Sequence, residues 1–244
     1  MSRRWLTVLR ILVVVAVVGV IAAGIGVVQA LVDPDSGTPR TAAERTIQSA
    51  EEAVTANPDD PAARVRLAAA YLEQGSPGLA KEQATLALRI DPELPDAHFV
   101  LGVAHYRLGE HEAAVESLTK AGTTEGQFAS FYQEVFVALG RAHEATGDYA
   151  AALEAMTTAV QYGPTNSLVY VERGLLFERN EEWFDAAADF AYSLIFVSDN
   201  QEAIDGLARI EQAHPEEYEK ARAHIEKVAA ELLPHSSEST PTAE

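Results

Sequence analysis

A repeat with a period of 34 residues runs through the middle of the chain and constrains the fold more than any other feature. Blocks that begin at Pro61, Pro95, Gln133 and Ser167 align position by position. The eighth position is always small: Ala68, Gly102, Gly140 and Gly174. The twentieth position is always alanine: Ala80, Ala114, Ala152 and Ala186. Such a period is typical of arrays in which each unit buries its apolar surface against its neighbours.

Two further positions hold residues of a constant size in every block. The twenty-seventh position is also small, with Ala87, Ala121, Ala159 and Ser193, and the eleventh is large, with Tyr71, His105, His143 and Phe177. Small residues let helices approach closely while large residues fill the gaps between them. Small residues at positions eight, twenty and twenty-seven resemble the tetratricopeptide repeat (TPR) family, most closely in residues 101–121 and 139–160. The resemblance implies an all-α TPR superhelix, a right-handed α-solenoid of helix-turn-helix repeats.

An apolar run at the N-terminus predicts a membrane anchor. At 1.5 Å per residue, residues 11–32 would reach about 33 Å, enough to cross a hydrocarbon core. Arg3, Arg4 and Arg10 precede the run, so the positive-inside rule places the N-terminus in the cytoplasm and the repeats outside the cytoplasmic membrane, as a single-pass protein. The alternative is a signal peptide cleaved near Ala30, which would release a secreted array.

The predicted organisation extends from this anchor to the C-terminus. In chain order it comprises a cytoplasmic N-terminus (1–10), a transmembrane helix (11–32), a linker (33–40), a half-repeat helix (41–60), four TPR units (61–94, 95–128, 133–166 and 167–200), C-terminal helices forming a partial repeat and a cap (201–233), and a disordered tail (234–244). Two departures from the family pattern stand out. Arg173 occupies a usual leucine position, and four extra residues near 122–130 should lengthen a helix or loop.

Composition and motifs argue against several kinds of function. The chain has no cysteine, so disulfides and thiolate chemistry are excluded. Its net charge of −19 argues against nucleic-acid binding, which needs clustered cations. No zinc-protease, nucleotide-binding or serine-nucleophile motif occurs. His98, His105 and His111 invite a metal interpretation, but His105 occupies the large eleventh position, which favours packing. We therefore expect no enzyme activity, no cofactor and no metal site.

The family resemblance places a peptide-binding groove on the first helices of the units, at positions two, five, nine, twelve and thirteen. The groove residues so implied are Val65, Ala69, Leu72, Phe99, Val103, Tyr106, Arg107, Val137, Arg141, Val171, Leu175 and Arg179. The Lys and Asn clamp of chaperone-binding relatives is absent. An apolar strip with a few arginines suits an amphipathic helix or an apolar peptide carrying acidic groups. The alternative is that neighbouring units or the terminal helices cover some of these side chains.

Together these features predict a membrane-anchored scaffold that binds a protein or peptide partner. An Arg-flanked anchor with an exported array resembles bacterial envelope proteins, including repeat subunits that assist cytochrome c maturation and others that serve secretion, pilus or cell-wall complexes. The residues do not choose among these pathways. The alternative function is a structural homo-oligomerisation module with no foreign client.

Overall fold

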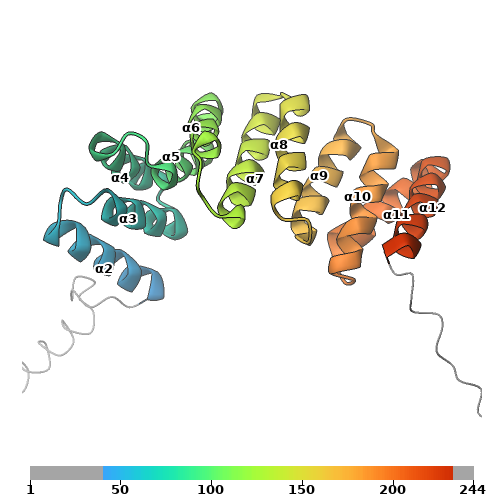
Figure 1. Cartoon of the computed structure of the whole chain (residues 1–244), viewed down its shortest axis with the longest axis horizontal. Helices are drawn as coiled ribbons and strands as arrows, with labels where there is room; N and C mark the ends of the chain where they lie inside the picture. The colour runs from blue at the N-terminus through green and yellow to red at the C-terminus, as the bar shows by residue number, and fades with distance from the viewer. Residues whose placement is uncertain (1–40, 233–244) are drawn as a thin grey trace, which may run out of the picture. The chain divides into compact units, whose positions relative to one another are not determined.

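The protein is seen here as a computed structural model that describes residues 41–232 (Figure 1). Within that range every element is an α-helix and no strand forms. The helices are α2 (Ala42–Ala56), α3 (Pro61–Gln74), α4 (Pro77–Ile90), α5 (Pro95–Arg107), α6 (His111–Thr123), α7 (Ala129–Thr146), α8 (Tyr149–Tyr162), α9 (Ser167–Arg179), α10 (Trp183–Phe196), α11 (Gln201–Ala213) and α12 (Pro215–Leu232). The all-α repeat architecture expected from the sequence is confirmed.

Several parts of the predicted organisation lie outside the described residues: the N-terminal segment, the apolar run 11–32, the linker 33–40 and the tail 234–244. Among residues 41–232, no helix is both long and apolar enough to span a membrane. Among the described residues, 41–48 belong to one structural unit and 49–232 to another. The first unit contributes the start of α2, where Thr41 and Glu44 form a capping box through reciprocal bonds of 3.1 and 3.2 Å.

The sequence sets the helix ends through capping residues. Proline occupies the first turn of α3, α4 and α5, where its missing N–H costs nothing. Asp60 and Asp148 accept bonds from backbone N–H groups at the starts of α3 and α8, at 2.9 and 3.1 Å. Asn166 and Asn200 do the same for α9 and α11, at 3.2 and 3.3 Å. These side chains satisfy N–H groups that have no partner inside a helix.

The turn between the two helices of each unit has a residue in the left-handed conformation at position fifteen of the block. Gly75, Gly109 and Gly147 have φ of 82°, 77° and 82°. Glu181 occupies the same position in the fourth unit, with φ of 62°, and is the one non-glycine residue with positive φ among those described. Glycine adopts this conformation without a Cβ penalty, so the fourth turn carries backbone strain that the other three avoid.

Within each unit, the residue at position eight is matched in size to the residue at position twenty-four. In the first unit both are alanine, Ala68 and Ala84, and both are fully buried. In the later units glycine faces a large side chain: Gly102 faces Leu118, Gly140 faces Met156 and Gly174 faces Phe190. The two helices therefore keep a close crossing because the first helix always supplies a small residue, and a larger residue on the second helix accompanies glycine rather than alanine.

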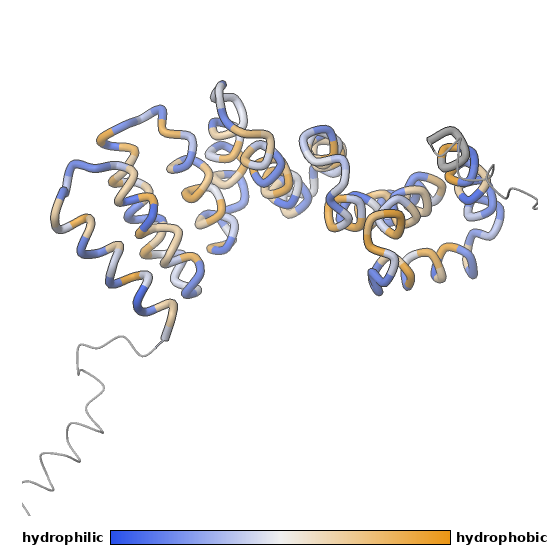
Figure 2. The backbone as a smooth tube through the Cα atoms, turned by 60° about the horizontal axis from the view of Figure 1, so that its bottom comes forward, coloured by the Kyte–Doolittle hydropathy of each residue, from blue (hydrophilic) through white to orange (hydrophobic). Residues whose placement is uncertain are grey.

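Between units, the second helix of one pair packs on the first helix of the next, as α4 does on α5 and α6 on α7. The first helices also meet: α3 contacts α5, α5 contacts α7 and α9 contacts α11. Along the tube in Figure 2, hydrophobic and hydrophilic residues alternate within the helices, as expected when one side of each faces the core. In the last unit, α12 packs against both α10 and α11.

The four extra residues between the second and third blocks lengthen a helix. α7 begins at Ala129, four residues before the block register at Gln133, and runs to Thr146. The added turn contributes Phe131, whose ring lies 5.8 Å from that of Phe99 in an edge-on arrangement. It also contributes Tyr132, which stacks on Tyr162 at 4.9 Å. The insertion therefore adds aromatic packing between the second and third units through Phe131 and within the third unit through Tyr132.

Arg173, the departure from leucine in the fourth block, forms a buried ion pair. Its Nε and Nη2 donate to the Asp189 carboxylate of α10 at 2.7 Å each, and the two side chains are 15% and 4% exposed. The guanidinium also lies over the Tyr170 and Phe177 rings, at 5.8 and 5.7 Å. Burial raises the pKa of Asp189 above its ordinary value despite the neighbouring cation. An arginine can therefore occupy this leucine position because α10, which packs against α9, supplies Asp189 as its partner.

Candidate functional site

The first helices of the four units, α3, α5, α7 and α9, carry the groove positions inferred from the sequence. We call this surface the A-helix face and define it by Val65, Ala69, Leu72, Phe99, Val103, Tyr106, Arg107, Val137, Arg141, Val171, Leu175 and Arg179. The arginines are exposed, and most of the apolar members are half-buried. Half-burial has a clear cause, since Phe99 and Val103 pack in the clusters on both sides of α5. The same side chains thus join the units and present an apolar surface.

Two of the predicted groove residues belong to the core. Val171 is 1% exposed and packs in a cluster that includes Phe190 and Ala203, from α10 and α11. Leu72 is 8% exposed and packs in a cluster formed by side chains of α3, α4 and α5. Neighbouring helices cover both side chains, which was the alternative raised from the sequence. The apolar part of the face therefore narrows to Val65, Ala69, Phe99, Val103, Tyr106, Val137 and Leu175.

The arginines of the face are engaged by neighbouring units. Arg141 of α7 donates two hydrogen bonds to the Glu172 carboxylate of α9, and these bonds raise the pKa of Arg141. Arg179 of α9 pairs in return with Glu144 of α7. The two helices are therefore linked by reciprocal ion pairs.

Two further arginines also bond to residues that lie about one repeat away in the sequence. Arg209 of α11 bonds the Glu178 carboxylate of α9 at 2.7 and 2.9 Å. Arg107 of α5 donates to the backbone carbonyl of Leu72, in the last turn of α3, where a cation is favoured by the helix dipole. The sequence placed Arg107, Arg141 and Arg179 on the groove and expected them to attract acidic groups of a partner, but it did not identify Arg209. The structure corrects that interpretation, because each has an acceptor within the array.

Two phenylalanines at the start of α7 were missed by the sequence interpretation. Phe131 covers one side of Phe99. Phe128, which caps the start of α7, is 83% exposed, the highest value among the exposed large hydrophobic residues described. The signal that could have found both is the insertion itself, which adds phenylalanines where sister units have none.

The histidines that invited a metal interpretation point to separate partners. His98 Nε2 lies 2.9 Å from the carbonyl of Pro92, and His105 Nδ1 contacts the Glu110 carboxylate, which also receives Lys81. His111 lies against the ring of Tyr106, at 5.6 Å. Among residues 41–232, no group of three or more His, Cys, Asp or Glu residues is placed to hold a metal ion. Lys81 and His105 lower the pKa of Glu110 and keep it ionised.

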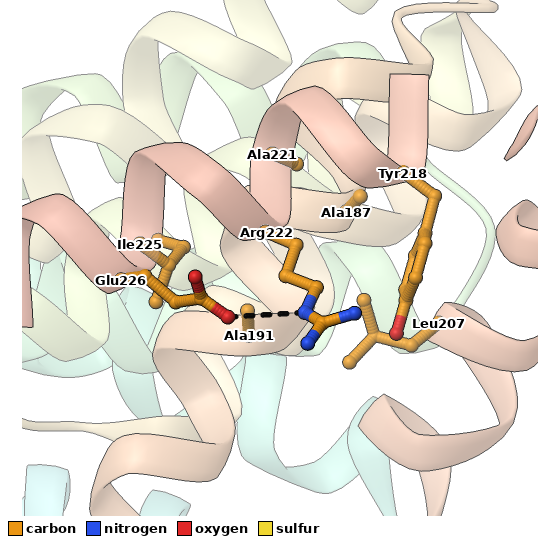
Figure 3. A pocket seen from close by; sticks show the side chains of 8 residues that line it. All are labelled: Ala187, Ala191, Leu207, Tyr218, Ala221, Arg222, Ile225 and Glu226. Carbon is orange, nitrogen blue, oxygen red and sulfur yellow. Dashed lines mark hydrogen bonds and ion pairs between the residues drawn. The ribbon is translucent and has the colours of Figure 1, made fainter. Parts of the chain in front are cut away.

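An apolar pocket of about 120 Å³ lies between α10, α11 and α12 (Figure 3). Its lining comprises Ala187, Ala191, Leu207, Tyr218, Ala221, Arg222, Ile225 and Glu226. Figure 3 shows Arg222 and Glu226 reaching toward each other along α12, where Nε and Oε1 are 3.0 Å apart. The pocket has the size of one apolar side chain and lacks a cluster of polar groups that could perform chemistry.

The comparisons with known proteins agree with this geometry. A model of the tetratricopeptide repeat family matches residues 41–95, 79–126 and 137–203, more than half of the chain. The chain belongs to the tetratricopeptide repeat family. No curated protein matches it.

Several solved TPR structures are similar to the chain. A crystal structure of MamA shares 22% identity with a TM-score of 0.56, covering 64% of this chain and 89% of MamA. The pilF protein of Pseudomonas aeruginosa shares 18% identity with a TM-score of 0.57, over 75% and 90% of the two chains. YrrB shares 14% identity with a TM-score of 0.54, over 74% and 99%. At these identities the likeness concerns the TPR fold.

Proposed function

We propose that this TPR protein is a membrane-anchored scaffold that binds a helical or apolar segment of a partner protein on its A-helix face. The observation that carries the proposal is the half-exposed apolar strip formed by Val65, Phe99, Val103 and Val137, which crosses successive first helices. Amphipathic helices bind such strips through apolar residues spaced along one helix face. YrrB, described as a TPR protein with an unusual peptide-binding site, offers a precedent for peptide binding on this fold.

The anchor and the pathway are parts of the same proposal. Residues 11–32 would hold the protein in the cytoplasmic membrane with the array outside, and the partner would be a component of an envelope complex, such as one that matures cytochrome c. Support for the anchor comes from the apolar run, which contains no charged residue and a single polar one, Gln29, and from the arginines before it. A scaffold in that place would keep a client segment near the membrane during assembly.

The test substitutes the strip with nearly isosteric polar residues and follows partner capture. Val65→Thr, Val103→Thr and Val137→Thr together keep side-chain shape while adding hydroxyls to the face. The matched control carries Val54→Thr, Val115→Thr and Val160→Thr, at valines of similar half-burial on the second helices.

The readout is crosslinking from native membranes, purification of the full chain and mass spectrometry. We expect the face variant to lose its partners by about tenfold or more, because several apolar contacts of about 1 kcal/mol each are weakened, while the control retains them. Unchanged partners in the face variant would contradict the proposal. If light scattering instead shows a tight oligomer that the same variant dissociates, and no foreign partner is captured, the homo-oligomerisation alternative replaces it.

A further inference from the structure

The charges around the A-helix face favour one kind of partner. We infer that the face binds an amphipathic helix whose apolar side is flanked by lysines and arginines, an inference that rests on the proposed function and specifies its partner. The arginines of the face are already bonded within the array, whereas several acids at its borders are not.

The cations of the face are held within the array. Arg141 and Arg179 of the face, together with Arg209 on the adjoining helix α11, each pair with a glutamate of a neighbouring first helix, and Arg107 donates to a backbone carbonyl. A partner carboxylate would have to break an existing pair to reach any of the first three. Because an exchange of one exposed ion pair for another gains little free energy, these arginines give an acidic partner a weak advantage.

Acids at the borders of the strip are not neutralised in this way. Asp96 of α5 and Glu134 of α7 occupy position two, near the start of their helices, and Glu73 of α3 occupies position thirteen, near its end. All three side chains are exposed, and within residues 41–232 none of them forms an ion pair. Unpaired acids therefore border the apolar strip at the starts of α5 and α7 and at the end of α3, whereas Arg107 and Arg179, at position thirteen of α5 and α9, are engaged within the array.

The wider field has the same sign. The chain carries 37 acidic against 18 basic residues, and most of the cations among residues 41–232 bond to acids or carbonyls. A cationic segment would be attracted at long range, whereas an acidic one would be repelled. This selects against the acidic apolar peptide that the sequence alone suggested, because that suggestion depended on free arginines.

The experiment uses two synthetic helical peptides that share one leucine face, with leucines spaced at i, i+3, i+4 and i+7, and differ only in flanking charge. One carries lysines beside the leucines and the other carries glutamates. Each is labelled with a fluorophore and titrated by anisotropy with the full chain in phosphatidylcholine nanodiscs, and binding to empty nanodiscs is subtracted. We expect the lysine peptide to bind about tenfold more tightly than the glutamate peptide, and salt to narrow the difference.

Substitutions then locate the effect. Glu73→Gln, Asp96→Asn and Glu134→Gln together should weaken binding of the lysine peptide about tenfold. The matched control, Glu82→Gln, Glu112→Gln and Glu154→Gln, removes exposed acids from the second helices and should change it less than about twofold. Arg179→Gln releases Glu144 and should strengthen binding about twofold, the opposite of what an arginine that reads the partner would show. Circular dichroism confirms that each variant is folded.

Failure of this inference and failure of the proposed function give different results. The charge preference is wrong if the glutamate peptide binds as tightly as the lysine peptide. It is also wrong if removing acids from the face and removing acids from the second helices change the affinity for the lysine peptide equally. If the valine-to-threonine face variant binds both peptides as the wild type does, the face itself is wrong. A lysine peptide that loses affinity in both the acid and the valine face variants, but in neither control, supports both.

Discussion

The size match between positions eight and twenty-four predicts that Gly102 cannot become alanine without cost. A Cβ there would lie 2.5 Å from Leu118 Cγ and 3.2 Å from Leu118 N, so α5 and α6 would have to separate. Overpacking costs up to about 3 kcal/mol, and alanine returns about 1 kcal/mol of helix propensity. We expect Gly102→Ala to lower the free energy of unfolding by about 2 kcal/mol, measured by urea unfolding of the full chain with far-UV circular dichroism.

A double-mutant cycle isolates the cause. Leu118→Ala alone should cost about 2–5 kcal/mol through the cavity it leaves. Combined with Gly102→Ala, it recreates the alanine pair that the first unit uses at Ala68 and Ala84, so the double variant should be more stable than the sum of the single effects predicts by about 2 kcal/mol.

A second glycine serves as the comparison. At Gly140 the added Cβ would meet Met156 Cε and Cγ at 3.0 Å and the Ala152 carbonyl oxygen at 3.3 Å. These contacts are longer than the 2.5 Å at Gly102, and methionine adjusts its shape easily, so Gly140→Ala should change stability by less than about 0.5 kcal/mol. Additive effects at Gly102 and Leu118, or equal costs at Gly102 and Gly140, would refute the size-matching argument.

Three further outcomes follow from other sites and can be measured by the same unfolding assay. Arg173→Leu should cost about 3 kcal/mol by leaving Asp189 buried without its cation, whereas adding Asp189→Leu should return stability to within about 1 kcal/mol of wild type; equal losses would contradict this. Burial and the 2.8 Å bond to Glu51 raise the pKa of Tyr71 to about 12. The folded state therefore holds this proton more tightly, and the extra stability is present below pH 10 and lost toward pH 12; Tyr71→Phe should flatten that decline, and an unchanged profile would count against it. Glu181→Gly should gain about 0.5–1 kcal/mol by relieving the left-handed strain, and a loss of stability would show that Glu181 is not strained.

Much of the architecture could be predicted from the sequence because its cause is local and repeated. Small residues at fixed positions, such as Ala80 and Ala114, allow two helices to cross closely. Their recurrence every 34 residues indicates that the same helix pair is repeated along the chain. Proline at Pro61 and Pro95 then marks where α3 and α5 begin. These signals act within one unit, so they can be read without knowing how units meet.

The surface could be predicted only in part because its details depend on contacts between units. Position five predicted Val65 and Val171 alike, yet Val65 is half-buried and Val171 is 1% exposed because large side chains of α10 reach it. The pairing of Arg141 with Glu172 likewise depends on the distance between two helices, which the pattern of one block does not encode. The binding role of the face and the membrane anchor stay predictions.

The ion pairs between first helices also bear on how such an array can change over evolutionary time. Each joins residues about one repeat apart, and the partners alternate: α7 supplies an arginine to one pair and a glutamate to the other. Deleting, duplicating or exchanging a unit would leave charges facing the wrong neighbour, although the helices themselves would still pack. The units are therefore similar in backbone but not interchangeable, because each pair of charged side chains matches only one order of neighbouring units.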